Sequence, residues 1–228
     1  MKKLLEVFLS ENGGKYDLTV LGYVAVALIA LLAFGLIFLL KSKKEKEEKK
    51  IDTKKLAFSS MLIAVGFVAS YLKLFSMPFG GSVTLFSMLF IALAGYWYGT
   101  KTGLLVAFTY GLLQFLQGPY IINFWQVGFD YIFAFTALGL SGLFRHKKHG
   151  LILGYLFAIV ARGFFHSLGG YLFYMSWIPD NYPQSLVSIY PLVYNYSYIL
   201  AEGALTVVVL FIPALRKAIE RVKEMTLA

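Results

Sequence analysis

An uncharged apolar run at residues 18–40, LTVLGYVAVALIALLAFGLIFLL, is the feature that most constrains how this chain can fold. A helix of about 20 apolar residues spans the ~30 Å hydrocarbon core of a bilayer. A secretory signal peptide has a shorter apolar region, roughly 7–15 residues, followed by a small-residue cleavage site. Here the run is longer and ends at Lys41. We therefore expect a retained membrane anchor at 18–40.

More apolar segments follow a charged stretch. The chain is 59% hydrophobic and only 14% charged, which is beyond the range of ordinary soluble domains. We therefore predict an all-α integral membrane protein in a lipid bilayer, with six transmembrane helices plus one additional N-terminal transmembrane helix. The predicted parts are an N-terminal segment with the anchor at 1–40, a charged cytoplasmic linker at 41–55, and a six-helix membrane domain with a basic cytoplasmic tail at 56–228. The six spans are expected at about 56–76, 83–99, 102–117, 124–144, 150–175 and 192–214.

The loop charges predict the orientation of these spans. The linker at 41–55 has eight lysines against four acids, the 145–149 loop reads RHKKH, and the tail after 215 is also basic. The loops at 76–81, 117–125 and 175–190 contain no Lys or Arg. Because cytoplasmic loops carry an excess of basic residues, we expect the C-terminus inside the cell and the N-terminus outside.

Several function classes lack their sequence signatures. The basic residues, which give a net charge of +9, occur in short runs between apolar segments, whereas a nucleic-acid binder gathers its charge on one face. The chain has no cysteine and no motif of a hydrolase, a zinc protease or a phosphate-binding loop. We therefore expect no enzyme activity, catalytic residue, metal, cofactor or nucleic-acid partner. Uphill transport would need energy from ions or from a partner protein.

Four ionisable residues stand out within the predicted spans: Asp130, Arg162, His166 and Glu202. Such groups are costly at membrane depth and normally face a cavity or a partner. Arg162 and His166 are four residues apart, and this helix face continues to Gly170 and Tyr174. Two further polar faces are expected, one with Gln126 and Asp130 and one with Asn195, Tyr198 and Glu202.

Structural interpretations of these groups stay open. Asp130 can form an ion pair with Arg162, His166 can be a packing residue, and Glu202 can contact Arg162 or a partner subunit. The glycines at 99, 103, 111, 139 and 142 are interpreted as helix-packing contacts. Acid, imidazole, amide and aromatic side chains on one side of the membrane nevertheless suit a small organic cation, because carboxylates supply charge and rings supply cation–π attraction.

Four stretches carry a resemblance to a known family. MPFGGSVTLFSML (77–89), GPYIINFWQVGFDYIFAFTALGLSGLF (118–144), RGFFHSLGGYLFY (162–174) and IYPLVYNYSYILAE (189–202) resemble the thiamine-specific substrate-binding (S) component of energy-coupling factor transporters. The resemblance covers about 56–215. It implies a six-helix protein of the bacterial cell membrane that binds thiamine in an outward-facing pocket. It also implies a transmembrane coupling subunit and two ATPase subunits as partners.

The resemblance implies a set of thiamine-binding residues. Asp130 matches the acid that faces the thiazolium ring, where the family often has Glu, and Tyr174 stands where some members have Trp, so that stacking can be shared with Trp177. Phe79 is the nearest match to the aromatic residue of the lid loop. Ser60 and Ala64 loosely match small residues that contact the coupling subunit. The remaining matches are Tyr131, Tyr120, His166, Arg162, Tyr190 and Asn195, and we add Glu202 from its helix face.

Other functions remain as alternatives. The ligand can be a thiamine precursor, such as the pyrimidine, instead of thiamine. A membrane-embedded enzyme using Asp130 and His166 is a second alternative, and a structural or signalling membrane protein is a third. We expect Trp125 and Trp177 at the mouth of the binding site, where their fluorescence would report a ligand.

Overall fold

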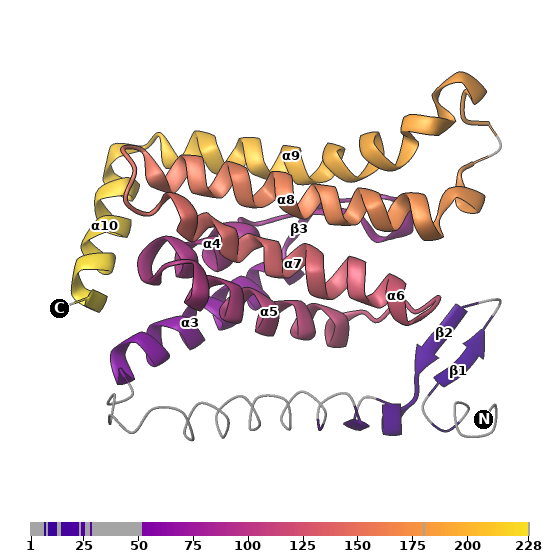
Figure 1. Cartoon of the computed structure of the whole chain (residues 1–228), viewed down its shortest axis with the longest axis horizontal. Coiled ribbons are helices and arrows are strands. Elements are labelled where there is room, and N and C mark those ends of the chain that lie inside the picture. Colours follow the sequence, from indigo (N-terminus) through magenta and orange to yellow (C-terminus); the bar gives the residue numbers. More distant parts are fainter. Residues whose placement is uncertain are drawn as a thin grey trace.

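Long helices lie side by side along the longest axis of the molecule (Figure 1). The computed structural model describes residues 52–179 and 181–227, together with residues 7, 9–12, 15–22, 24, 25 and 28. Four helical stretches within these residues are long and apolar enough to cross a membrane. They are α3 (Thr53–Tyr71), the composite helix Phe124–Phe144, α8 (Gly150–Phe173), and Gln184–Leu210, which contains the 3-10 turn η5 (Gln184–Ile189) and α9 (Tyr190–Leu210).

Most of the predicted anchor at 18–40 and of the linker at 41–55 lies outside the described residues. Leu18, its first residue, ends strand β2 (Lys15–Leu18), which pairs antiparallel with β1 (Leu9–Asn12). The sequence did not predict this hairpin. The linker ends sooner than expected, because Asp52 caps α3 by accepting a hydrogen bond of 2.9 Å from the Lys55 amide.

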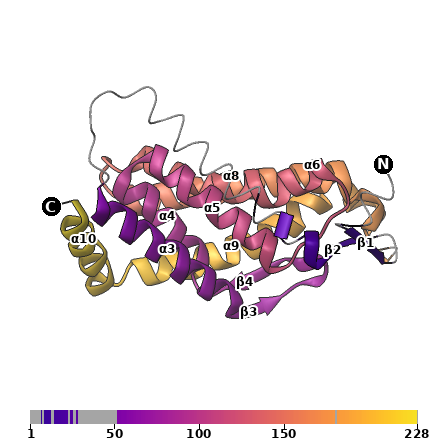
Figure 2. The same ribbon diagram turned by 90° about the horizontal axis from the view of Figure 1, so that it is seen from below.

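A second hairpin replaces two pieces of the predicted spans. Strands β3 (Lys73–Ser76) and β4 (Ser82–Thr84) pair antiparallel around a 3-10 turn, η1 (Pro78–Gly80). We expected residues 73–76 to continue the first span and 83–84 to begin the second, so that part of the all-helical prediction was wrong. Figure 2 shows the hairpin alongside α3 and α9, and β4 contacts both helices.

Helix α4 (Ser87–Tyr98) is short and occupies the centre of the bundle. Nearly all of its residues are buried, and it packs against α3, α5 (Thr100–Gln117) and α8. Its N-cap residue, Phe86, has a left-handed backbone and provides no side-chain cap. The first amides of α4 therefore need acceptors from another element.

The composite helix changes its winding around Asp130. It begins as α6 (Phe124–Val127), becomes π-helical over Gly128–Phe133, returns to α7 (Ala134–Thr136), and ends as a 3-10 helix over Ala137–Phe144. Asp130 is in the π-helical segment. Short π segments inside α-helices are frequent at functional sites.

Small residues allow α5 to touch the composite helix. A Cβ atom on Gly139 would lie 2.3 Å from the carbonyl carbon of Gly103, which is too close for any side chain. A Cβ atom on Gly142 would likewise lie 2.4 Å from the amide nitrogen of Thr100. These contacts confirm that Gly103, Gly139 and Gly142 serve helix packing, whereas Gly99, with φ 87°, forms the junction between α4 and α5.

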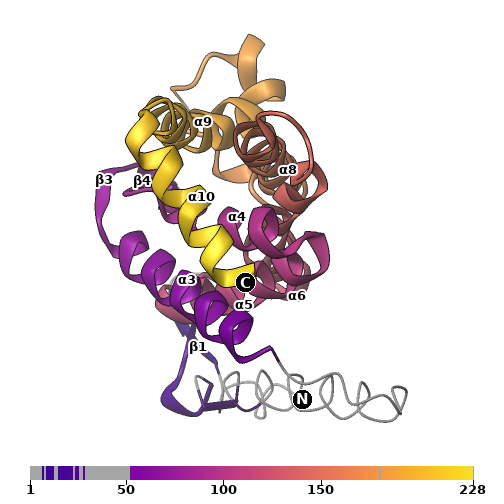
Figure 3. The same cartoon turned by 90° about the vertical axis from the view of Figure 1, so that its left-hand side faces the viewer.

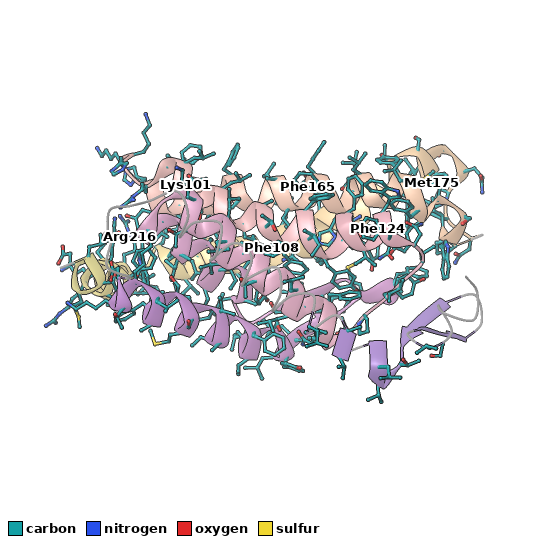
Figure 4. All side chains as sticks on the ribbon, turned by 60° about the horizontal axis from the view of Figure 1, so that its bottom comes forward. Lys101, Phe108, Phe124, Phe165, Met175 and Arg216 are labelled. Atoms are coloured by element: carbon teal, nitrogen blue, oxygen red, sulfur yellow. The ribbon has the colours of Figure 1, made fainter. Side chains whose placement is uncertain are left out.

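The two ends of the bundle differ in character. Lys101 and Arg216 lie at one end, whereas Phe124 and Met175 lie at the other (Figure 4). At the basic end, α10 (Pro213–Leu227) turns away from α9 after Pro213 and lies across the helix ends (Figure 3). The predicted last span at 192–214 therefore ends earlier, at Leu210.

Candidate functional site

A single cavity of about 760 Å³ collects the residues that the sequence singled out. Helices α3, α5, α8 and α9, the composite helix and the β3–β4 hairpin all contribute to its wall. The volume lies within the range of small-molecule sites. All eleven predicted binding residues line the cavity, namely Phe79, Tyr120, Asp130, Tyr131, Arg162, His166, Tyr174, Trp177, Tyr190, Asn195 and Glu202.

The Asp130 carboxylate accepts its hydrogen bonds from uncharged side chains. Its Oδ2 accepts a hydrogen bond of 2.8 Å from Gln126 Nε2 and one of 2.7 Å from the Tyr174 hydroxyl. Its Oδ1 lies 3.6 Å from His166 Nδ1. One oxygen is therefore fixed by two donors, and the other retains capacity to interact with a ligand.

The ion pair between Asp130 and Arg162, which the sequence left open, is not present. Arg162 Nε instead lies 3.4 Å from His166 Nε2 in hydrogen-bonding geometry, and its guanidinium lies over the Phe135 ring, 4.3 Å from the centroid. An Nε2 atom that accepts from Arg162 places the imidazole proton on Nδ1, on the side of Asp130. His166 thus belongs to a polar chain and is not only a packing residue.

Aromatic side chains surround the acid. The rings of Tyr120 and Tyr174 are stacked with centroids 6.1 Å apart, and Trp177 meets Tyr120 edge-on at 6.2 Å. The Tyr131 hydroxyl donates to the Gly118 carbonyl and accepts from the Tyr120 amide, which fixes the loop after α5. Burial, reinforced by the Asp130 charge, raises the pKa of Tyr120, so its phenol stays neutral.

Helix α9 contributes a second polar face. Asn195 Nδ2 donates to the Pro191 carbonyl at 2.8 Å and to the His166 carbonyl at 3.3 Å, while its Oδ1 accepts from the Tyr198 hydroxyl at 2.9 Å. Tyr190 stacks on Tyr194, one helical turn further on. The predicted face of Asn195, Tyr198 and Glu202 is therefore confirmed as a cavity wall.

Glu202 has a different environment from Asp130. It is 2% exposed, and its four acceptor contacts all go to the chain that leads into α4. Oε2 accepts from the Thr84 amide at 2.8 Å and the Thr84 hydroxyl at 2.6 Å, and Oε1 accepts from the Met88 amide at 3.1 Å and the Ser87 hydroxyl at 3.4 Å. This carboxylate supplies the missing cap of α4, where the helix dipole favours a negative charge. Within the described residues, no hydrogen bond or ion pair joins it to Arg162.

The β3–β4 turn is fastened to α9. The Tyr194 hydroxyl donates to the Pro78 carbonyl and accepts a hydrogen bond of 3.1 Å from the Gly81 amide. Phe79, whose backbone is left-handed with φ 64°, places its ring against Tyr194 at 6.3 Å. The turn that carries Phe79 is therefore held over the cavity by one phenol.

Sequence reasoning missed Tyr110 and Tyr194, which also line the cavity, and misplaced Trp125. The spacing of four residues between Tyr194 and Tyr198 was the available signal for Tyr194. Gln126, which was predicted on one face with Asp130, is fully buried and donates to that carboxylate. Trp125 is 64% exposed and is not part of the cavity lining, so its expected place at the mouth was wrong.

Among the described residues, no group of three or more His, Cys, Asp or Glu side chains is arranged to hold a metal ion. The polar groups of the cavity thus lie among rings and amides. They suit the recognition of an organic ligand.

Comparison with known proteins identifies the family. The family model described as thiamine transporter protein matches residues 56–221, most of the chain. The chain belongs to the thiamine transporter family. It is therefore a transport protein and not an enzyme, and the resemblance found in the sequence is confirmed.

Individual members of the thiamine transporter family show how far the similarity extends. The thiamine transporter ThiT of Bacillus subtilis (strain 168) is 33% identical over 154 residues, which cover 59% of this chain and 76% of that protein. The solved structure of ThiT from Listeria monocytogenes is similar with a TM-score of 0.55 and 23% identity, over 70% of this chain and 94% of that one. The fold is therefore that of a helical, multi-pass membrane protein.

Proposed function

We propose that this chain is the substrate-binding component for thiamine in an energy-coupled importer of the bacterial cell membrane. The observation that carries the proposal is the Asp130 carboxylate, held by neutral donors in a cavity lined with aromatic rings. A cation taken out of water needs such a counter-charge and such ring faces. Thiamine offers a thiazolium cation of suitable size.

In this proposal Asp130 balances the thiazolium charge. Tyr174 both orients that carboxylate and, stacked with Tyr120, offers ring area to the ligand. Trp177 closes the same aromatic group from the loop after α8. Tyr131 positions the Tyr120 backbone, so its contribution to binding is through the loop.

The polar side chains on α8 and α9 would orient the rest of the ligand. His166 presents Nδ1 toward Asp130, and Asn195 is fixed by one hydrogen bond to α8 and two within α9. Tyr190 and Phe79 would cover the ligand from the side of the hairpin. We assign Glu202 to positioning, because its oxygens are occupied by the amides and hydroxyls before α4.

Energy for transport would come from partner subunits. The family resemblance implies a transmembrane coupling subunit and two ATPase subunits, and this chain has no nucleotide-binding motif. Ser60 and Ala64 are exposed on the same face of α3, four residues apart, so their backbones are open to close approach by a partner helix.

We further propose six membrane crossings in residues 56–228, with α4 and α5 completing the four longer helices. The basic end, marked by Lys101 and Arg216, would be cytoplasmic, and the cavity mouth would face outward. Residues 1–40 would add an anchor with its N-terminus outside, joined by the linker at 41–55.

The test is a tryptophan fluorescence titration of the purified full-length protein with thiamine, since Trp177 lines the cavity. We expect a saturable change, and weaker binding of the uncharged pyrimidine precursor. Tighter binding of the precursor would reassign the ligand, and the absence of any saturable response would overturn the function.

A further inference from the structure

Tyr110 on α5 is a buried phenol without a partner. The side chain is 0% exposed, and its hydroxyl forms no hydrogen bond with any described residue, yet it lines the cavity. The hydroxyls of Ser70 and Ser87 lie close enough to interact with it, but neither meets the geometry of a hydrogen bond to the Tyr110 hydroxyl. They are engaged elsewhere, with Gln117 at 2.9 Å and with Thr84 at 2.6 Å. Because buried hydroxyls in proteins are nearly always paired, this one requires an explanation.

The acceptors around Tyr110 are hydroxyl and carboxylate oxygens that already take part in other hydrogen bonds. The Tyr110 ring meets Phe135 edge-on at 5.4 Å, and the Arg162 guanidinium lies over the Phe135 ring. Arg162 forms no ion pair with a described carboxylate, so N–H groups beyond Nε remain available. The nearest buried acid, Glu202, already accepts from Thr84, Ser87 and Met88. We call Tyr110, Phe135 and Arg162 the cavity floor.

We propose that the cavity floor is a subsite for a hydrogen-bond acceptor on the uncharged part of the ligand, with the Tyr110 hydroxyl as its donor. This inference rests on the proposed function, because Asp130 is taken to hold the cationic part. The ligand class is then an organic cation whose other end carries a nitrogen or oxygen lone pair. Thiamine has two such groups, the ring nitrogens of its pyrimidine and the oxygen of its hydroxyethyl arm.

The decisive variant is Tyr110→Phe in the full-length protein, which removes only the hydroxyl. Without ligand, a buried donor that has no partner disfavours folding, so we expect the variant to unfold at a higher temperature than the wild type. With thiamine, the lost hydrogen bond should weaken binding about three- to tenfold. A gain in thermal stability together with a loss of affinity for thiamine is specific to a donor that has no partner until the ligand binds.

Tyr155→Phe is the matched control. Tyr155 is also 0% exposed, but its hydroxyl donates to Thr206 at 3.0 Å, and it does not line the cavity. We expect this variant to lose stability and to bind thiamine as the wild type does. Comparing the two variants therefore separates the effect of losing any buried phenol hydroxyl from the effect of losing the one at the cavity floor.

Two analogues distinguish the acceptors. One analogue is thiamine with a pyrimidine nitrogen replaced by C–H, and the other is thiamine without the hydroxyethyl oxygen. For one of the two, we expect the Tyr110→Phe variant and the wild type to bind with equal affinity. The insensitive analogue identifies the group at the floor. If Tyr110→Phe binds thiamine like the wild type, or is less stable than the wild type, the subsite is overturned while the proposed function stands. If the wild type itself binds no thiamine, the proposed function fails first and this inference with it.

Discussion

The Glu202 carboxylate on α9 accepts a hydrogen bond of 3.1 Å from the Met88 amide in the first turn of α4. A charged side chain of one helix thus caps the start of another helix inside the bundle. The contact ties α9 to α4 and, through Thr84, to the hairpin that borders the cavity. The two acids of the cavity, Asp130 and Glu202, therefore have separate tasks.

Glu202→Gln tests the capping role. The variant turns an acceptor oxygen into an N–H group that faces the donors of Thr84 or Met88, so we expect the free energy of unfolding to fall by about 2–4 kcal/mol. Thermal unfolding in detergent measures this, with the exposed Glu224→Gln as a control expected within about 0.5 kcal/mol of the wild type. Unchanged stability together with a selective loss of cation binding would instead make Glu202 a ligand-binding acid.

Asp130→Asn tests the counter-charge. Asparagine keeps the shape and much of the hydrogen bonding, but the cation loses its charged partner at a cost on the order of 2–5 kcal/mol. Affinity for thiamine should therefore fall at least about thirtyfold, while a neutral thiamine analogue should lose much less. Titrations with both ligands measure the two affinities, and thermal stability is measured alongside. Equal losses of affinity for thiamine and for the neutral analogue would rule out an ionic role of Asp130.

Tyr194→Phe tests the attachment of the hairpin turn. The variant removes both hydrogen bonds that hold the Pro78 carbonyl and the Gly81 amide, while the ring contact with Phe79 is kept. We expect thiamine to dissociate about three- to tenfold faster because the turn is released more readily. Stopped-flow fluorescence of Trp177 measures the rate. A change confined to the association rate would contradict this explanation.

Removal of the N-terminal part tests whether thiamine binding depends on it. The family match begins at residue 56, beyond the expected anchor. We expect a protein that starts near residue 51 to insert into membranes and to bind thiamine with nearly unchanged affinity. A loss beyond tenfold, about 1.4 kcal/mol, in a well-folded truncation would mean that residues before 51 contact the site.

Uptake experiments test the need for partners. Vesicles that contain only this chain should bind thiamine but should not accumulate it above the outside concentration, since the chain carries no nucleotide-binding motif. Radiolabelled thiamine and an imposed ion gradient provide the measurement. Concentrative uptake driven by the gradient would show that the chain works without ATPase subunits.

Helical periodicity explains how much of the site could be predicted. Arg162, His166, Gly170 and Tyr174 recur every fourth residue, and α8 with its C-cap residue Tyr174 turns all four toward the same cavity. A regular helix converts sequence spacing into a shared face, so such predictions need no knowledge of other elements. The site residues on α8 and α9 were therefore accessible from the sequence.

The features that were missed depend on contacts between elements. Residues 73–76 and 83–84 were predicted as the end of one span and the start of the next, and only their pairing across the intervening turn makes them a hairpin. The isolation of the Tyr110 hydroxyl is likewise decided by which groups other helices bring near it. The Glu202 cap joins residues more than a hundred positions apart, and no local pattern in the sequence indicates it.

The π-helical winding around Asp130 makes the length of this segment as important as its composition. A π turn accommodates one more residue than the α turn it replaces. Deleting a single residue between 127 and 129 would rotate Asp130 by about 100° relative to the preceding turn, and so change its direction relative to Gln126 while the remaining side chains stayed the same. Members of this family that differ by an insertion or deletion here would have to rebuild their cation site, whereas conservative substitutions around the acid would leave its direction intact.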